Sequence, residues 1–349
     1  MAIQQLVGGQ QNLGVRFHLV NVVPSTLATL IVVGIVWSGA PSHPPRLSRV
    51  LEVATGLDVG EALLLAFGIT VLALGSQPLQ RSLVRTLEGY WLEQPFCPLW
   101  LRRLATAWPR RRLGRLSALA DHDPTQAATA GRGAWRVDAE RQRAATAAYQ
   151  RWRRYPAEER LLSSALGNAL RAAEDDAGQR YGLETVLVWP ALYAVLGERT
   201  RAIIDDQRTQ LDVAARLAAT LAVTALLAGG LLARWWPWGV VVPVGLLGLA
   251  WLSYRAAVSA AVAYGDGLRL AFDLSRFELL RTLHLPLPAD SDSELAANRR
   301  LSAFLALGKP LQVAYQHDQQ PPPSPPAQAP DGPAAAAAAA APEQRATGS

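Results

Sequence analysis

The stretch LAATLAVTALLAGGLLARWWPWGVVVPVGLLGLAWLSY, from Leu217 to Tyr254, holds two uncharged apolar runs separated by the turn RWWPW. A helix rises about 1.5 Å per residue, so each run covers most of a bilayer core that is roughly 30 Å thick. Pro237 ends the first helix, and the tryptophans of the turn suit the headgroup level of a membrane. The stretch therefore predicts an antiparallel transmembrane hairpin.

Two further apolar runs precede this hairpin. HLVNVVPSTLATLIVVGIVW, from His18 to Trp37, is long enough to cross a bilayer. A cleaved signal peptide is the competing interpretation, because Arg16 precedes the run and small residues follow it. We favour a retained span, since the run is long for a signal peptide. ALLLAFGITVLALG, from Ala62 to Gly75, is shorter; a buried core helix is its alternative, which would leave three spans.

The distribution of arginine predicts the side on which the polar part lies. Between Arg81 and Arg115 eight arginines stand against two glutamates, a net charge of +6, whereas the segment between the first two runs has only Arg46 and Arg49. The positive-inside rule then places the large middle domain and both termini in the cytoplasm, at the plasma membrane. The basic cluster comprises Arg81, Arg85, Arg102, Arg103, Arg110, Arg111, Arg112 and Arg115.

The basic segment 81–115 follows a predicted span directly. We expect it to lie flat on anionic inner-leaflet lipids, with an apolar face on one side, arginines on the other, and no role in nucleic-acid binding. Nucleic-acid binding is the alternative for a basic run, but the neighbouring span favours lipid. The expected apolar face consists of Leu99, Trp100, Leu101, Leu104 and Trp108.

These patterns predict an all-α integral membrane protein with about four transmembrane helices and a helical cytoplasmic domain inserted between helices 2 and 3. The predicted parts are a cytoplasmic N-terminus at 1–16, spans at 17–38, 60–78, 213–234 and 239–255, external segments at 39–59 and 235–238, the domain at 79–212, cytoplasmic amphipathic helices at 256–310 and a disordered Pro/Ala-rich tail at 311–349.

Within the domain the pattern predicts several helices. One charged helix is expected from Ala134 to Tyr155, and a second is expected to begin at Pro156, with acidic residues in its first turn. From Gly197 a charged helix is expected to continue unbroken into the third span. A further short helix is expected over 293–307.

Four residues form the most concentrated polar group of the chain: Glu174, Asp175, Asp176 and Arg180. We interpret them as a candidate docking site for a protein partner. The alternative is a solvated helix end with an ion pair to Arg180. Three consecutive carboxylates point in different directions around a helix, so their spacing does not by itself make a catalytic pair.

The predicted spans carry no charged residue at their centres, which favours an anchor or an assembling bundle over a carrier with a charged relay. In the third span Ala218, Ala222, Ala225 and Gly229 recur at intervals of four, three and four residues. Such a smooth face predicts close helix packing, either within the chain or in a homo-oligomer.

The segments GVRFHLVNVVPSTL, QPLQRSLVRTLEGYW and LGNALRAAEDDAGQRYGLETVLVWP resemble uncharacterised integral membrane proteins of actinobacteria. The resemblance extends over most of the chain, from Gly14 to Pro286. It implies the architecture described above and, because no activity is attached to it, it implies no site residues.

The sequence has no Walker A loop, no GxGxxG after a strand, and no HExxH or GxSxG motif, and its five histidines lack ligand spacing. We therefore predict no catalytic residue, cofactor or metal, and an enzyme is the less favoured class. The first hypothesis is a non-enzymatic membrane anchor, scaffold or signalling partner that acts through its cytoplasmic helical domain. The alternatives are an oligomeric pore or transport component, and a lipid-modifying enzyme using Arg85 with Glu88 or the Glu174–Asp176 group.

Overall fold

The computed structural model describes residues 23–75, 77–93, 97–120, 134–311 and 313–316, and all regular structure in these ranges is helical. The first predicted span lies partly outside them, and the C-terminal tail almost entirely. The elements are α2 (Val23–Trp37), α3 (Leu47–Gly56), α4 (Val59–Gly75), α5 (Gln77–Glu88), η2 (Tyr90–Glu93), α6 (Leu99–Ala120), α7 (Ala134–Trp152), η4 (Glu158–Arg160), α8 (Ala165–Asp176), η5 (Gln179–Tyr181), α9 (Thr185–Val195), α10 (Glu198–Leu232), α11 (Trp238–Thr282) and α12 (Ser291–Leu307).

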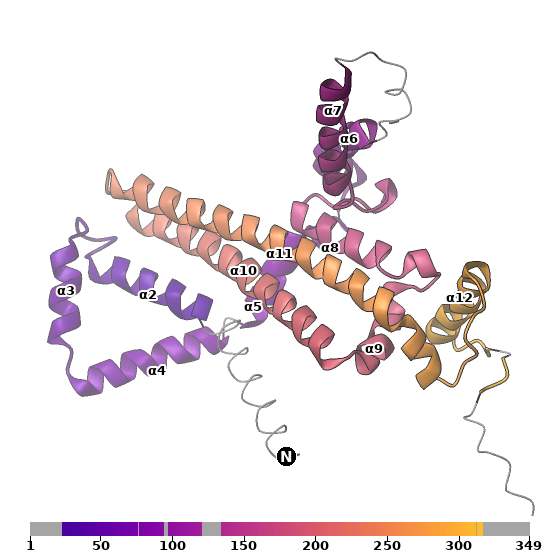
Figure 1. Ribbon diagram of the computed structural model, residues 1–349. Helices are drawn as coiled ribbons and strands as arrows, with labels where there is room; N and C mark the ends of the chain where they lie inside the picture. The colour runs from indigo at the N-terminus through magenta and orange to yellow at the C-terminus, as the bar shows by residue number, and fades with distance from the viewer. Residues whose placement is uncertain (1–22, 76, 94–96, 121–133, 312, 317–349) are drawn as a thin grey trace, which may run out of the picture.

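Helices α10 and α11 form a long antiparallel hairpin that is the axis of the molecule (Figure 1). They contain 35 and 45 residues, and both are long and apolar enough to cross a membrane. Helix α10 runs unbroken from its charged start into the apolar run, as the sequence predicts. We call residues 217–254 the membrane half of the hairpin, and 198–216 with 255–282 the domain half.

The predicted small-residue face of α10 packs against α11 of the same chain. Ala218 and Ala225 are buried, and Ala222 packs against the cluster that Ala225 forms with Leu246 of α11. A Cβ atom at Gly229 would lie 3.6 Å from Cγ of Pro243, at van der Waals distance. The small residues therefore let α10 and α11 approach each other, as expected for close packing of membrane helices.

The N-terminal helices lie beside the membrane half. Helix α2 packs on α10, and Ile31 and Ile35 contact the α10–α11 cluster. The indole Nε1–H of Trp235 donates to the carbonyl oxygen of Pro41 at 3.0 Å, which ties the segment after α2 to the hairpin turn. Helix α4 contacts α2 and leaves Leu64 and Phe67 about 70 % exposed. Both helices are apolar, but each has fewer than 18 residues.

The segment predicted as an external loop contains helix α3. This helix and α4 are bent by 113° at the break between them, so together they count as a broken span or as a re-entrant loop. Among the described helices, two are long and apolar enough to cross a membrane, or up to three if the bent pair is one span.

Helix α8 lies along the domain half of α11. Its closest approach is at Gly265, where a Cβ atom would lie 2.7 Å from Cβ of Ala173, so only glycine fits. Helix α5 crosses α10 and α8, and α9 and α12 close the far end (Figure 1). The largest core cluster gathers around Phe272, with Val188, Leu192 and Leu301, all completely buried. Burial of such side chains is the main source of stability for this half.

The helix predicted to begin at Pro156 begins instead at Ala165. Ser164 is its N-cap, and the Ser164 side chain accepts a hydrogen bond from the Gly167 N–H at 2.9 Å. The Asn168 side chain holds Leu162 on both its N–H and its carbonyl group, at 2.8 and 2.9 Å. These local side-chain bonds compete with helix before Ala165, which is why the earlier start is wrong.

Candidate functional site

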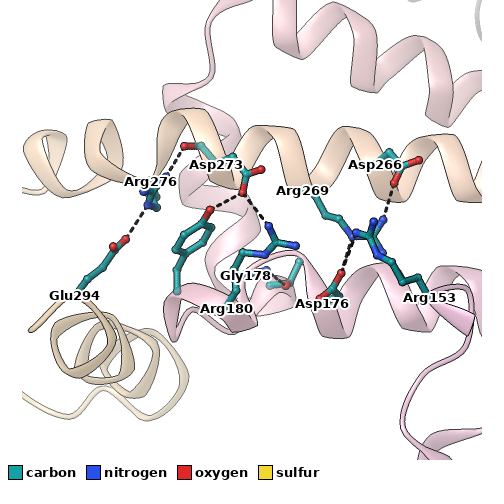
Figure 2. A network of polar contacts seen from close by, with 11 residues as sticks. Arg153, Asp176, Gly178, Arg180, Asp266, Arg269, Asp273, Arg276 and Glu294 are labelled. Atoms are coloured by element: carbon teal, nitrogen blue, oxygen red, sulfur yellow. Dashed lines mark hydrogen bonds and ion pairs between the residues drawn. The ribbon is translucent and has the colours of Figure 1, made fainter. Parts of the chain in front are cut away.

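Arginine–carboxylate pairs join α8, α11 and α12 along the domain half (Figure 2). Arg269 of α11 donates to Asp176 at the end of α8 and to Asp266 on its own helix, both at 2.6 Å. Arg153, which follows α7, lies 3.5 Å from the same Asp176 carboxylate. The Arg269 side chain is only 11 % exposed, whereas Asp176 and Asp266 are 44 % and 63 % exposed, so the guanidinium is buried while both carboxylates keep contact with solvent.

One helical turn further, Asp273 connects α11 to η5. The Tyr181 hydroxyl donates to Asp273 at 2.6 Å, and Arg180 lies 3.8 Å from the same carboxylate. Burial, followed by the hydrogen bond to Asp273, raises the pKa of Tyr181, so the hydroxyl keeps its proton as the donor. The pairing fixes η5 against α11.

Arg276 connects α11 to α12. Its guanidinium donates to Glu294 at 2.7 Å and lies over the rings of Tyr181 and Phe277, at 4.1 and 4.3 Å from the ring centroids. Both partners of the ion pair are less than a fifth exposed. Asn298 of α12 donates to the carbonyl oxygen of Tyr181 at 2.8 Å. The ion pair with Glu294, the contacts of the guanidinium with two rings and the hydrogen bond from Asn298 to the backbone therefore lie close together. Together they hold α12 in place.

Three of the four residues predicted as a docking site, Asp175, Asp176 and Arg180, are engaged within the chain. Asp176 pairs with Arg269, and Arg180 with Asp273, as described above. Asp175 forms an ion pair with Arg160. The ion pair of Arg180 thus goes to α11 and not to the neighbouring carboxylates. These residues join helices, a role that their spacing in the sequence does not indicate.

A second polar group gathers where α5 crosses α10. Burial raises the pKa of Glu88, and the charges of Asp212 and Glu174 raise it further, against the lowering effect of Arg208. Burial also raises the pKa of Glu174. Arg208 pairs with Asp212 at 3.4 Å and lies 5.5 Å from the ring centroid of Tyr264. Carboxylates with raised pKa near a guanidinium are the feature of this structure that is closest to an acid–base constellation.

The boundary between membrane half and domain half is marked by Tyr254. Its hydroxyl oxygen accepts hydrogen bonds from the backbone N–H groups of Ala165 and Leu166, at 3.1 and 3.2 Å. These are first-turn donors of α8 that have no partner within the helix. The Ser164 hydroxyl donates to the Glu88 carbonyl oxygen at 2.7 Å, so α5 ends at the same point. Sequence reasoning missed this junction; a tyrosine at the end of an apolar run was its only signal.

Two hollows adjoin the ion pairs. A cavity of about 280 Å³ lies between α7, α8 and α11, and Arg153, Arg154 and Arg269 line it together with Asp266. A cavity of about 370 Å³ lies under α6 and α7, lined by Tyr149, Trp152 and Tyr155 among others. In the part of the chain that the structure describes, no group of three or more His, Cys, Asp or Glu side chains could hold a metal ion.

The predicted basic cluster divides between two helices. Arg81 and Arg85 belong to α5, which packs on α8 and α10, whereas the other six belong to α6. Helix α6 packs chiefly on α7, and this pair stands out sideways from the hairpin (Figure 1). The two parts of the segment therefore do not form one continuous surface.

The sequence predicts that the arginines and the apolar residues of α6 lie on opposite faces of the helix. In the structure they share one exposed face, so this prediction is wrong. Trp100, Leu104 and Trp108 are more than 60 % exposed, and Arg111 and Arg115 continue the same exposed strip. The buried residues of α6 are Thr106, Pro109 and Leu116. The helical turn brings the arginines round to the tryptophan side, because positions three and four residues apart share a face.

Comparison with known proteins gives no further guide: no family model matches the chain, and neither a curated protein nor a solved structure shows significant similarity to it.

Proposed function

We propose that this chain is a plasma-membrane scaffold that holds a helical domain rigidly at the cytoplasmic face for a protein partner. The observation that supports this most directly is the continuity of α10 and α11. Each helix runs without a break from the membrane half into the domain half, where α8 and α12 are fastened to α11. A domain mounted in this way has no flexible linker to the membrane.

The proposal counts four spans, with α2 and α4 as the other two and α3 on the external surface. Three features support it: α2 packs along α10, the side chains of α4 are widely exposed as lipid contacts would require, and Trp235 bonds to Pro41 at the same end. The arginine distribution supports a cytoplasmic domain and cytoplasmic termini.

The chemistry of the domain also favours a scaffold. Asp176, Asp273 and Glu294 each pair with an arginine of the same chain. In the Arg276–Glu294 pair both side chains are less than a fifth exposed, so breaking it would leave an uncompensated buried charge, and the pair favours one arrangement of the helices. A docking surface whose helices are already fixed does not have to become ordered when the partner binds. Binding free energy is then not lost to that ordering.

The test is partner retention by the full-length chain, purified in mild detergent from its native membrane. A protein should co-purify in stoichiometric amount with the wild-type chain. Asp176→Asn, which removes the charge facing Arg269, should lower the retained amount, and hydrogen exchange of α8 should rise. Asp206→Asn is the matched control, because Asp206 is an exposed residue of α10 that accepts a hydrogen bond from Gln210 on the same helix. Absence of a stoichiometric partner would refute the scaffold.

A lipid-modifying enzyme is the second candidate, supported by the raised pKa of Glu88 and Glu174 beside Arg208. A carboxyl group with a raised pKa can act as a general acid near neutral pH. Turnover of labelled native lipid by the reconstituted chain, abolished by Glu88→Gln and kept by the exposed control Glu159→Gln, would establish it. Equal turnover in both variants would eliminate Glu88 as the acid.

A further inference from the structure

Helix α6 carries an exposed strip that runs the length of the helix. Starting at Trp100 the strip positions follow at intervals of four, four, three, four and four residues, which keeps them on one face. Leu119 near the far end is 58 % exposed, and Trp100 at the start is 67 % exposed. The α6 strip consists of Trp100, Leu104, Trp108, Arg111, Arg115 and Leu119.

The charge of α6 is of one sign. The helix holds six arginines and no acidic residue. Of these, Arg110 pairs with Glu158 at 2.8 Å, and the Arg112 guanidinium lies 5.1 Å from the Trp108 ring centroid. A face that mixes exposed tryptophan and leucine with arginine is complementary to a surface that is negative outside and apolar beneath.

The position of α6 brings it near such a surface. The end of α5 at Glu88 is bonded to Ser164, and the adjacent start of α8 is bonded to Tyr254, where the apolar run of α11 ends. Arg110 of α6 pairs with Glu158, six residues before Ser164, which places α6 beside the start of α8 and so near the edge of the membrane half. From there α6 and α7 extend sideways, across the direction of the hairpin (Figure 1).

We infer that the α6 strip binds the anionic headgroups of the bilayer that the chain itself spans. Arg111, Arg112 and Arg115 contact phosphate groups, while Trp100, Leu104 and Trp108 enter the headgroup layer. The α6–α7 pair then contacts the membrane at a second place, beside the hairpin, and so fixes the rotation of the domain relative to the membrane plane. This inference rests on the proposed cytoplasmic placement of the domain, but it does not depend on a protein partner.

The single cysteine of the chain provides the probe. Cys97 is partly exposed and lies two residues before α6, so the full-length protein can be labelled there with an environment-sensitive fluorophore. The labelled protein is placed in nanodiscs whose two leaflets have the same composition, so its orientation does not matter. The fraction of phosphatidylglycerol in phosphatidylcholine is then raised from none to about one third.

Emission should shift to the blue and intensify as phosphatidylglycerol increases, and 1 M salt should reverse the change, because it shortens the screening length to about 3 Å. One arginine near an anionic surface contributes about fivefold to the ratio of lipid-bound to lipid-free α6 strip, so Arg111→Gln with Arg115→Gln should lower that ratio roughly 25-fold. The matched control is Arg141→Gln with Arg143→Gln, two exposed arginines of α7, which should leave the response unchanged.

Two results would overturn the inference. One is an emission that does not depend on phosphatidylglycerol, and the other is an equal loss of response in the α6 variant and the α7 variant. A shift on adding RNA to neutral nanodiscs, without any response to lipid charge, would assign the strip to nucleic acid instead. Because these nanodiscs hold no other protein, the result is independent of the partner-retention test.

Discussion

The two halves of the α10–α11 hairpin are built from the same two helices and share one seam of small and apolar side chains, yet their outer faces differ. In the membrane half Ala225 and Ala250 fill the seam, and in the domain half Ala215 and Ala261 do so. Outside the seam, the membrane half exposes residues such as Leu252, at 60 %, whereas the domain half bears Arg269 and Arg276.

The difference separates two physical tasks. The seam determines that the two helices pair, and it works in lipid and in water because close packing does not depend on the solvent. The outer faces determine what surrounds the pair: exposed apolar side chains and helix α2 for the membrane half, and helices α8 and α12 for the domain half. Helices α8 and α12 can therefore add to the hairpin only beyond Tyr254.

Phe272→Ala tests whether the two halves are separately stable, and it should have the largest effect. Phe272 is completely buried in the domain core, so its truncation should cost the domain half about 3–5 kcal/mol. Hydrogen exchange of the full-length chain in micelles should rise across α8, α9 and α12 and stay low in the membrane half. Leu252→Ala is the control, because that side chain faces outward. Equal deprotection of both halves would mean that they unfold as one unit.

Gly167→Ala and Gly245→Ala compare tight and open glycines in the two halves. A Cβ atom at Gly167 would lie 1.8 Å from the Glu88 carbonyl oxygen, whereas nothing lies within 4 Å at Gly245. The first change should destabilise the domain half by about 1–3 kcal/mol, and the second should be neutral or slightly stabilising. Denaturant titration monitored by tryptophan emission measures both. A neutral Gly167→Ala would show that α5 is not held against α8 as described.

Glu174→Gln should have the smallest effect, and one that depends on pH. Because the folded-state pKa of Glu174 is raised above 4.5, its ionised form destabilises the fold, and the stability relieved by protonation is lost as pH rises through the folded value. The variant should therefore be more stable than the wild type at pH 7, and the difference should vanish as pH falls toward 4.5. A variant less stable at pH 7 would show that the Glu174 carboxylate is needed as a charged partner. The membrane half should show no such dependence.

Much of the helical arrangement could be predicted, because it follows from local patterns in the sequence. The unbroken course of α10 and the existence of α12 follow from apolar periodicity and helix caps. The start of α8 could not be read in this way, because Ser164 and Asn168 act through side-chain bonds to the backbone that composition does not distinguish from helix.

The ion pairs of the domain were beyond prediction for another reason. Arg269 and Asp176 are 93 residues apart, and they meet only because Gly265 lets α8 approach α11 closely. The sequence indicated a polar group at Glu174–Asp176, but the partners of these residues depend on the packing of helices that are distant in the chain. The α6 strip, by contrast, could be recognised in the sequence, because Trp100, Leu104 and Trp108 are spaced four residues apart.

In the proposed membrane placement, the hydrogen bonds that the Tyr254 hydroxyl accepts from the start of α8 fasten α8 to α11 at the membrane surface. A thinner bilayer makes spanning helices tilt, and in this placement the tilt of α11 passes to α8 and α12. The far end of the domain would then move along the membrane surface by an amount set by lipid chain length. Distance measurements from α12 to the bilayer plane in lipids of different chain length would record that movement.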